Sequence, residues 1–505
     1  MNKKNIYIFF NMILSLYKKN YLLKNMSEII ENPTLEEFAK NKTYIGVIEK
    51  TVFGGKGLIS IEGFKILIKN GIEGQKVEYL VTKKKKSYAE GRIEKVLEHS
   101  ELEIPEEERR NALPGCPYQN ISYENQLKMK YRQLSEIFRN YEDVEIPEFK
   151  GSPEVFGYRN KMEFSIGYEK MTREIVDGKK IWKDEGVAVG FHPAGSWSDV
   201  VSIDDVFLAS EAVNIIRREV EAILKRSKCL KKAPWNPLIS KGFWRGLIFR
   251  ESKATGDIAI NFVVHSHQDD KFWERLVASI LDVELPEGSQ VVGILETVNA
   301  GRSDAVNNPE ITTLYGDARI LETLGKTDFE ISPFSFFQTN SKGAEVLYDT
   351  VKSKIGDTEG KNVLDLFCGA GTIGIYCASD ANKIVGIEMV REAVKQAKHN
   401  AKINDIDNAE FIAGKVEMVL PEVLEQDDFD TVIIDPPRVG MHPKALQYVA
   451  KLPIKKLVYI SCNPSTLERD VDALKLSGWR LKEVQGVDMF PHTPHMEVIA
   501  VIEKD

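Results

Sequence analysis

The chain has 505 residues, enough for two to four domains, and its 43% hydrophobic content is that of an ordinary soluble globular protein. Its five cysteines show no paired short spacing, which argues against a disulfide framework or a zinc site and fits a reducing cytoplasm. The net charge of −8 indicates no global affinity for nucleic acid, although local fields matter more than the total.

Residues 1–40 are expected to form an extension outside the folded domains. The stretch NIYIFFNMILSLY near the start is apolar and flanked by lysines. It is too short for a comfortable membrane span, and no small-residue cleavage site follows it. Met26 then opens a sequence that reads like a natural start. We therefore interpret residues 1–25 as an upstream extension of the coding start, and expect no membrane association.

Residues 41–98 consist of short strand-like runs separated by Gly-rich turns, a pattern typical of a small antiparallel barrel. The segment holds 12 Lys and Arg against 7 Glu and no Asp, so its net charge is +5 and that of the remaining chain is −13. The four lysines at 83–86 fit a solvated turn, the commoner interpretation of a charge run. A basic barrel in an otherwise acidic chain nevertheless favours an accessory domain that binds nucleic acid.

The rest of the chain predicts three further segments. Residues 99–150 are acidic and mostly helical in pattern, which indicates a connecting segment. Residues 151–330 mix strands and helices, as in a central α+β domain. Residues 331–505 alternate apolar strands and helices regularly, which is the signature of a doubly wound, Rossmann-like parallel sheet. The predicted fold class is therefore α/β, with an OB-like β-barrel and an α+β domain preceding the doubly wound domain.

A glycine-rich turn follows the first apolar strand of that last domain, in VLDLFCGAGTIG at residues 363–374. Glycines such as Gly369 and Gly371 let a ligand approach the backbone beside a helix N-terminus. Glu388 ends the next strand and is placed to hold ribose hydroxyls. This geometry serves a dinucleotide or S-adenosylmethionine equally well, and a plain tight turn is the non-functional interpretation.

Two residues of the same motif favour a methyl donor over a dinucleotide. Asp365 lies inside the strand and Phe367 precedes the glycines, and a methyl-donor site has no pyrophosphate to cradle. A nicotinamide-dependent oxidoreductase remains an alternative that the glycine pattern alone leaves open.

Two further motifs end strands at the same predicted edge. In TVIIDPPRVG, residues 431–440, Asp435 follows a strand, and two prolines stiffen the loop after it. In LVYISCNPSTLERD, residues 457–470, Cys462 sits where the strand meets a polar loop. A doubly wound sheet brings both close to the glycine turn, so Cys462 is interpreted as a nucleophile rather than a small buried hydrophobe.

The last strand begins at Glu497, an acid in an otherwise apolar run that would often simply face solvent. His492 and His495 precede it, but two histidines without further ligands make a poor metal site, so turn-forming and hydrogen-bonding roles are expected for them. A methyl donor, a cysteine and an acid together suit methylation of a pyrimidine at carbon 5. Thiolate addition to carbon 6 activates carbon 5, and a base then removes its proton.

Five segments carry a resemblance to a known family: FSFFQTN, LDLFCGAGTIG, IDPPRVG, YISCNPSTLERD and FPHTPHMEVIA. They resemble the successive motifs of the S-adenosylmethionine-dependent RNA uracil-5 methyltransferases, which make 5-methyluridine in transfer or ribosomal RNA. The basic barrel resembles the TRAM domain that many of these enzymes carry. The resemblance extends from about residue 41 to the end and is loosest in the central region.

The resemblance implies that Cys462 is the nucleophile and Glu497 the general base. The residues implied to bind the methyl donor are Gln338, Phe367, Gly369, Gly371, Glu388 and Asp435. The residues expected to contact RNA are Arg159, Asn160, Lys161, Phe336, Phe337 and Arg469, with core packing an equal alternative for the two phenylalanines. Arg438 after Pro437 departs from the Cys that RNA cytosine-5 methyltransferases place there, and from the aromatic of amino-group methyltransferases.

One departure from the family bears on a second cofactor. Many ribosomal-RNA members hold a [4Fe–4S] cluster on four cysteines, whereas this chain offers Cys116 alone and has Val206 at the fourth ligand position. We therefore expect no iron–sulfur cluster. The TRAM-like barrel favours 23S ribosomal RNA over transfer RNA, and a cytoplasmic monomer is expected. The alternatives are a transfer-RNA uracil-5 methyltransferase and a catalytically idle RNA-binding protein with the same fold.

Overall fold

The computed structural model describes residues 30–31, 33–110, 112–169, 171–176, 179–184, 186–193, 195–226, 232–301, 310–332, 334–377 and 380–504. They divide into two compact units: the chain up to Asn111 with Pro117–Met129, and Ala112–Cys116 with the chain from Lys130. The interpretation of residues 1–25 falls outside the described part. Within it, no helix has the length and apolar character needed to cross a membrane.

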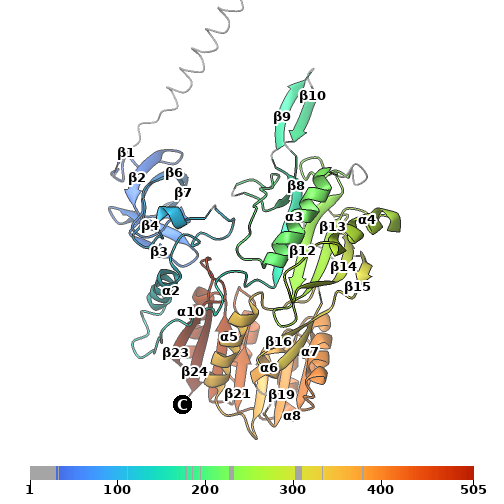
Figure 1. Cartoon of the computed structure of the whole chain (residues 1–505). Helices are drawn as coiled ribbons and strands as arrows, with labels where there is room; N and C mark the ends of the chain where they lie inside the picture. Colours follow the sequence, from blue (N-terminus) through green and yellow to red (C-terminus); the bar gives the residue numbers. More distant parts are fainter. Residues whose placement is uncertain are drawn as a thin grey trace, which may run out of the picture. The chain divides into compact units, whose positions relative to one another are not determined.

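The first unit contains a seven-stranded sheet in the order β1-β2-β6-β7-β5-β4-β3, drawn in blue in Figure 1. Alternate residues of β2, β5 and β6 point inward, so Tyr44, Ile66 and Tyr79 form a buried core and the lysines face out. The described strands thus fit the barrel-like domain expected from the sequence. Their bounds are β1 Ile30–Glu31, β2 Thr43–Val47, β3 Lys50–Val52, β4 Lys56–Ile61, β5 Phe64–Lys69, β6 Lys76–Lys84 and β7 Tyr88–Glu98.

The segment after this sheet is less helical than its sequence predicts. Its described residues form a short 3-10 helix, η1 (Glu106–Glu108), and one α-helix, α2 (Tyr123–Ile137), with turns between them. The pattern of the sequence overstated the helix content, because much of the segment lies in irregular turns.

Lys130 of α2 is fully buried, and its Nζ donates a hydrogen bond to the Asp488 carboxylate at 2.7 Å.

The central region has a six-stranded mixed sheet in the order β11-β8-β12-β13-β14-β15. Helices α3 (Glu211–Arg226) and α4 (Asp270–Leu281) pack against it and against each other (Figure 1). Two hairpins, β9–β10 and β16–β17, form separate two-stranded sheets. The strand bounds are β8 Lys161–Tyr168, β9 Met171–Val176, β10 Lys179–Asp184, β11 Val187–Gly190, β12 Trp244–Glu251, β13 Asp257–Val264, β14 Gln290–Val298, β15 Glu310–Gly316, β16 Ile320–Leu324 and β17 Thr327–Ile331.

The C-terminal sheet has seven strands in the order β20-β19-β18-β21-β22-β24-β23. All pair in parallel except β24, which is antiparallel to both neighbours. Its strands are β18 Asn362–Leu366, β19 Lys383–Glu388, β20 Ala409–Ala413, β21 Thr431–Ile434, β22 Lys456–Ser461, β23 Trp479–Val487 and β24 Glu497–Lys504. The strand order reverses between β18 and β21, and open α/β sheets bind their ligands at the carboxyl ends beside such a reversal.

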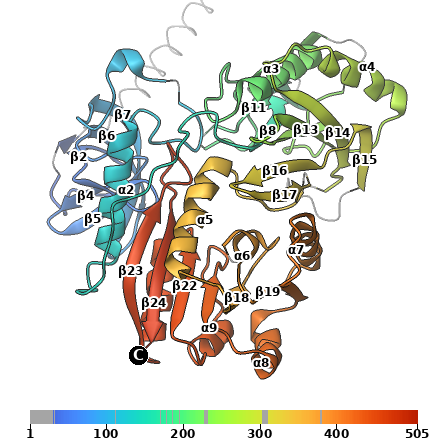
Figure 2. The same ribbon diagram turned by 60° about the horizontal axis from the view of Figure 1, so that its bottom comes forward.

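Two layers of helices flank this sheet, as Figure 2 shows for most of them. In one layer α5 contacts α6 and α6 contacts α7; in the other α8 contacts α9 and α9 contacts α10. The helices are α5 Ser341–Ile355, α6 Thr372–Cys377, α7 Arg391–Ile403, α8 Val416–Gln426, α9 Pro443–Val449 and α10 Pro464–Lys475. The predicted doubly wound architecture is confirmed for this domain.

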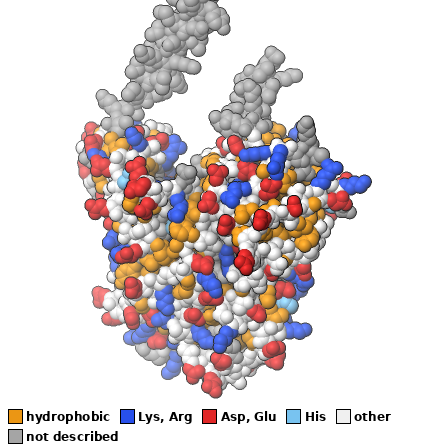
Figure 3. All heavy atoms as spheres, in the orientation of Figure 1, with side chains coloured by type: hydrophobic (Ala, Val, Ile, Leu, Met, Phe, Trp, Pro, Cys, Tyr) orange, Lys and Arg blue, Asp and Glu red, His pale blue; other side chains and the backbone are white. Residues whose placement is uncertain are grey.

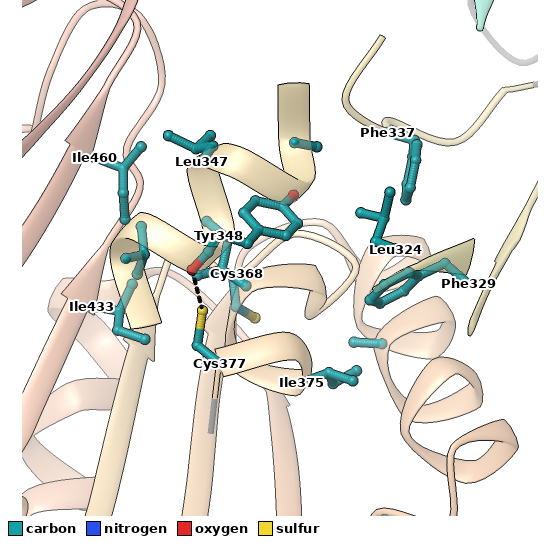
Figure 4. Close-up of a cluster of buried hydrophobic side chains, with 14 of the residues drawn as sticks. Leu324, Phe329, Phe337, Leu347, Tyr348, Cys368, Ile375, Cys377, Ile433 and Ile460 are labelled. Atoms are coloured by element: carbon teal, nitrogen blue, oxygen red, sulfur yellow. Dashed lines mark hydrogen bonds between the residues drawn. The ribbon is translucent and has the colours of Figure 1, made fainter. Parts of the chain in front are cut away.

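An apolar cluster lies between α5, α6 and the sheet (Figure 4). Tyr348 from α5 is central to it, and the thiol of Cys377 in α6 donates to the Tyr348 carbonyl oxygen at 3.4 Å. Phe337 belongs to the same cluster and packs on Phe329 with ring centroids 5.9 Å apart. The strand ends that carry the sequence motifs therefore rest on a packed core.

Candidate active site

The glycine turn after β18 combines a strained residue with two left-handed glycines. Phe367 has φ +63°, which costs a non-glycine residue of order 1–3 kcal/mol, and its N–H donates to the Ile387 carbonyl at 2.9 Å. A side chain added to Gly369 would meet no atom within 4 Å, so the space beside its backbone is open. One added to Gly371 would come within 2.8 Å of the Phe411 ring. The turn thus leaves room for a ligand directly against the main chain.

Two carboxyl groups brace this turn. Glu388, at the end of β19, accepts hydrogen bonds from the N–H groups of Gly369 at 3.2 Å and Val390 at 2.7 Å. Asp365, fully buried in β18, accepts the N–H of Gly374 at 3.1 Å through Oδ2, while its Oδ1 has no hydrogen-bond partner in the described part of the chain. Burial raises the pKa of Asp365 to about 8, and the negative charge of Asp435 adds to the rise.

Asp435 follows β21, next to β18 in the sheet, and its N–H donates to the Leu366 carbonyl at 3.2 Å. Burial raises the pKa of its carboxyl to about 7. Gln338 is half-buried just before α5, in a segment held by Asn160, whose side chain donates to the Gln338 carbonyl at 2.8 Å. Asn160 is 1% exposed, so the structure gives it this bracing role and leaves it little surface for RNA.

Cys462 and Glu497 are brought together by the antiparallel pairing of β22 with β24. Ser461 pairs with Val498 in that ladder. The next pair outward is therefore Cys462 opposite Glu497, one residue beyond the end of β22 and at the first residue of β24. Directly opposed residues of an antiparallel pair have Cβ atoms about 4.5–5.5 Å apart. The thiol and the carboxyl thus share one small region of the sheet edge.

The electrostatics of this pair are those of two acids held in a poorly solvated site. Burial raises the pKa of the Cys462 thiol to about 11, and Glu497 and Asp435 raise it further while Arg438 lowers it. Burial also raises the pKa of Glu497 well above its usual value, with Asp435 adding and Arg438 opposing. Strongly perturbed pKa values in a cluster of this kind are typical of functional sites.

Arg438 is a site residue that the sequence did not single out, except to separate families. It follows the two prolines after Asp435, is exposed, and its guanidinium makes no hydrogen bond or ion pair with any other described residue. Its charge favours the ionised forms of both Cys462 and Glu497. The sequence signal for this role would be a basic residue in a loop at a strand end near that of Cys462. Basic residues are common in such loops, so the signal is not specific.

The loop between β23 and β24 holds the two predicted histidines in polar and ring contacts. His492 is buried and stacks on Phe156 with ring centroids 4.8 Å apart. The N–H of His495 donates to Thr493 at 3.2 Å, and burial lowers the pKa of its ring, with Arg438 adding to the effect. These positions fit the turn-forming and hydrogen-bonding roles expected from the sequence.

The residues expected to contact RNA fall into different environments. Phe336 is 77% exposed, whereas Phe337 is 4% exposed in the core, as the packing alternative describes. Lys161 forms an ion pair with Glu163 at 2.5 Å. Arg159 is half-buried, and its charge reaches His495. Arg469 donates to the Asp470 carboxylate and to the Val439 carbonyl, so its guanidinium braces a loop.

Cys116 packs as an apolar residue. It is 3% exposed in the central core cluster that also contains Val206, and burial raises the pKa of its thiol to about 12. Within the described ranges, no group of three or more His, Cys, Asp and Glu side chains is arranged to hold a metal ion.

The seven-stranded sheet with one antiparallel strand, the glycine turn after β18 and the acid at the end of β19 define a class I methyltransferase fold. A solved structure that covers most of this chain supports the assignment of the fold. The tRNA (uracil-54, C5)-methyltransferase of Pyrococcus abyssi, in complex with S-adenosyl-L-homocysteine, superposes with a TM-score of 0.67 and 28% identity, covering 91% of this chain and 100% of that one.

The family follows from sequence comparisons. The profile of the tRNA (Uracil-5-)-methyltransferase family matches residues 122–505. A Clostridium tetani protein described as an uncharacterized RNA methyltransferase is 38% identical over 471 residues, covering 92% of this chain and 98% of the relative. One from Caldanaerobacter subterraneus, described likewise, is 38% identical over 470 residues, covering 92% and 100%. The chain belongs to the tRNA (uracil-5-)-methyltransferase family and is an RNA methyltransferase, which confirms the resemblance of its motifs.

Proposed function

We propose that this protein transfers the methyl group of S-adenosylmethionine to carbon 5 of a uridine in RNA, with Cys462 as nucleophile and Glu497 as general base. The observation that carries the proposal is the ladder that sets Cys462 opposite Glu497 beside Asp435 and the glycine turn. A thiol and a carboxyl are the two groups that substitution at carbon 5 of a pyrimidine requires.

The residues at the glycine turn fit S-adenosylmethionine. The open space beside Gly369 admits a ligand against the backbone, and the Glu388 carboxylate retains lone pairs for ribose hydroxyls. Phe367, Gln338 and Asp435 complete the proposed donor site. When bound, the donor supplies an electrophilic methyl group on a sulfonium. An acidic edge such as this suits a cationic donor better than a pyrophosphate, which favours the methyl donor over a nicotinamide dinucleotide.

Cys462 acts on the uracil ring. Its thiolate forms a bond to carbon 6, and the electron pair of the 5,6 double bond moves to give an enolate whose carbon 5 is nucleophilic. The thiol must first lose its proton, which its raised pKa of about 11 disfavours at neutral pH in the free protein. Arg438 opposes that rise, so its charge supports formation of the thiolate. The target uridine must leave its stack to reach the thiol.

Glu497 completes the substitution. After carbon 5 has gained the methyl group, the carboxylate removes the proton that remains there. The 5,6 double bond re-forms as the bond between carbon 6 and the Cys462 sulfur breaks. Burial and the nearby charge of Asp435 raise the pKa of Glu497, which makes its carboxylate a stronger proton acceptor than a solvated one.

Two RNA classes are candidates for the substrate. The sequence prediction is 23S ribosomal RNA, because of the basic barrel. The archaeal neighbour favours transfer RNA, since its name gives uracil 54 of tRNA as the target. The superposition spans all but about 9% of this chain and therefore reaches into residues 41–98, so the likeness to this neighbour is not confined to the C-terminal domain.

Nucleoside mass spectrometry tests the function and the substrate together. The protein is incubated with S-adenosylmethionine and, separately, unmodified 23S ribosomal RNA or transfer RNA, and each RNA is then digested. New 5-methyluridine in one pool is the expected result and names the RNA class. The absence of 5-methyluridine from both pools, with protein that binds the methyl donor, would favour the idle RNA-binding alternative.

A further inference from the structure

The backbone of the loop that follows β21 forms several hydrogen bonds with side chains in α10 or just before it. Residues 435–442 connect β21 to α9, and α10 begins two residues after Cys462. The carbonyl of Arg438 accepts hydrogen bonds from Asn463 Nδ2 at 3.3 Å and Thr466 Oγ1 at 3.4 Å. Both donors follow the proposed nucleophile Cys462 within four residues, so the loop that carries Arg438 and the segment after Cys462 are bound directly to each other.

Asp470 and Arg469 hold the next residues of the same loop. The carbonyl of Val439 accepts a hydrogen bond from Arg469 Nη2 at 3.0 Å. The N–H of Met441 donates to Asp470 Oδ2 at 2.8 Å, and Asp470 Oδ1 accepts from Arg469 Nη2 at 2.7 Å. Asp470 is 1% exposed and also accepts the hydroxyl of Tyr459 at 2.7 Å, so its carboxylate is fully engaged.

Gly440 makes this fastening close. It has φ +79°, and a Cβ added there would lie 2.4 Å from Arg469 Nη2 and 2.7 Å from Asp470 Oδ2. The loop therefore approaches the two charged side chains as nearly as backbone can, which only glycine permits. By contrast, the Arg438 side chain itself has no hydrogen-bonding partner among the described residues, so its direction depends on how the loop backbone is held.

We propose that Asp470, together with Arg469, is a positioning residue for the reaction: it fixes the loop after β21 so that the Arg438 guanidinium lies beside Cys462 and Glu497. This deepens the proposed function and rests on it for the roles of those two residues. It also assigns Arg469 to bracing this loop, where the sequence suggested a contact with RNA. Asp435 is held independently by the hydrogen bond to Leu366, so loss of Asp470 should move Arg438 and leave Asp435 in place.

The test is the pH dependence of Cys462 alkylation by iodoacetamide, followed by peptide mass spectrometry of the whole protein without RNA or methyl donor. The charged groups acting on this thiol are Glu497, Asp435 and Arg438. Moving the one cation away should raise the thiol pKa. Asp470→Asn should therefore slow alkylation at a fixed pH by about threefold to tenfold, the change that a rise of about half to one pKa unit produces.

Four further variants distinguish a positioning role of Asp470 from a purely stabilising one. Gly440→Ala should give the same shift by pushing the loop off Asp470, and it tests the proposal if Asp470→Asn does not fold. Arg438→Ala by itself should shift the pH profile of alkylation. The double variant Arg438→Ala/Asp470→Asn should shift it no further than Arg438→Ala, because both substitutions remove the same effect, the charge of Arg438 beside the thiol. Asp472→Asn, on the same helix and bonded to Tyr141, is the matched control and should leave the profile unchanged.

An unshifted alkylation profile in folded Asp470→Asn and Gly440→Ala would overturn the proposal, as would shifts that simply add to that of Arg438→Ala. The measurement needs neither RNA nor a methyl donor. If nucleoside analysis fails while the alkylation shifts appear, the proposed function is wrong and the positioning role stands. If 5-methyluridine forms and no alkylation shift appears, the proposed function stands and the positioning role of Asp470 is wrong.

Discussion

The donor half of the sheet edge, at the ends of β18 and β19, differs from the catalytic half, around β21, β22 and β24, in what holds its groups in place. The donor half is shaped by the backbone. Phe367 and Gly371 adopt left-handed conformations, and main-chain N–H groups donate hydrogen bonds to the Glu388 carboxylate. The catalytic half depends on side chains that come from far apart in the sequence. A few neighbouring residues can create space for a ligand beside the main chain. The pKa of a reactive thiol, by contrast, is set by charged groups that several elements bring together.

On the face drawn in Figure 3, basic and acidic side chains are interspersed over the C-terminal domain. Buried acids with raised pKa values lie in both halves, Asp365 in the donor half and Asp435 and Glu497 in the catalytic half, so the halves differ in what holds their groups rather than in acidity. If the two halves are separate in this way, substitutions in one should spare the measured property of the other.

The largest effect is expected from Cys462→Ala. It should lower turnover by at least about a thousandfold and abolish covalent RNA adducts, because it removes the sulfur that is proposed to attack carbon 6. Binding of S-adenosylhomocysteine, measured by calorimetry, should be unchanged. Cys116→Ala, in the apolar core of the central region, is the control and should still form adducts. An adduct formed by Cys462→Ala would place the nucleophile elsewhere.

Glu497→Gln should slow product release rather than attack. The amide cannot take the proton from carbon 5, so a methylated protein–RNA adduct should accumulate and survive denaturing electrophoresis, while net turnover falls by about a hundredfold to ten-thousandfold. Donor binding should again be spared. Normal turnover by this variant would show that another group is the base.

Gly371→Ala should affect the donor half alone. The added methyl group would meet the Phe411 ring at 2.8 Å on a residue with φ +73°, so the turn must move. We expect affinity for S-adenosylhomocysteine to fall by about tenfold or more, a loss of roughly 1.4 kcal/mol. The alkylation profile of Cys462 should stay where it is. A parallel change in that profile would mean that the two halves are coupled.

Stability, rather than activity, should depend on pH through Asp365. The folded pKa of Asp365, about 8, lies above the unfolded value, so the folded state holds an extra proton between about pH 4 and pH 8. The free energy of unfolding should therefore fall as pH rises through that window, by up to about 1.4 kcal/mol per pH unit from this group. Asp365→Asn should flatten the fall, measured as Tm against pH, whereas exposed Asp472→Asn should not. Parallel curves for Asp365→Asn and the unaltered protein would exclude this contribution.

Much of the C-terminal domain could be predicted from local pattern. Apolar runs such as VLDLF and LVYIS, each followed by a polar turn and a helix, are buried parallel strands whose carboxyl ends meet at one edge. This brought Asp435 and Cys462 into one predicted site. Phe336 and Phe337 show where local pattern stops, because adjacent aromatic residues look alike in sequence. One is 77% and the other 4% exposed, and only packing against Phe329 distinguishes them.

By itself the sequence determined the α/β class, the glycine turn with its acid, and the cysteine at a strand end, since each depends on residues within a few positions of one another. Tertiary structure alone decided the rest. The antiparallel return of β24 sets Glu497 opposite Cys462, although 35 positions separate them in the chain. Contacts from α10 bind the loop that carries Arg438. Such charges act through space, and their effect on a pKa depends on distance and burial, which no local pattern specifies.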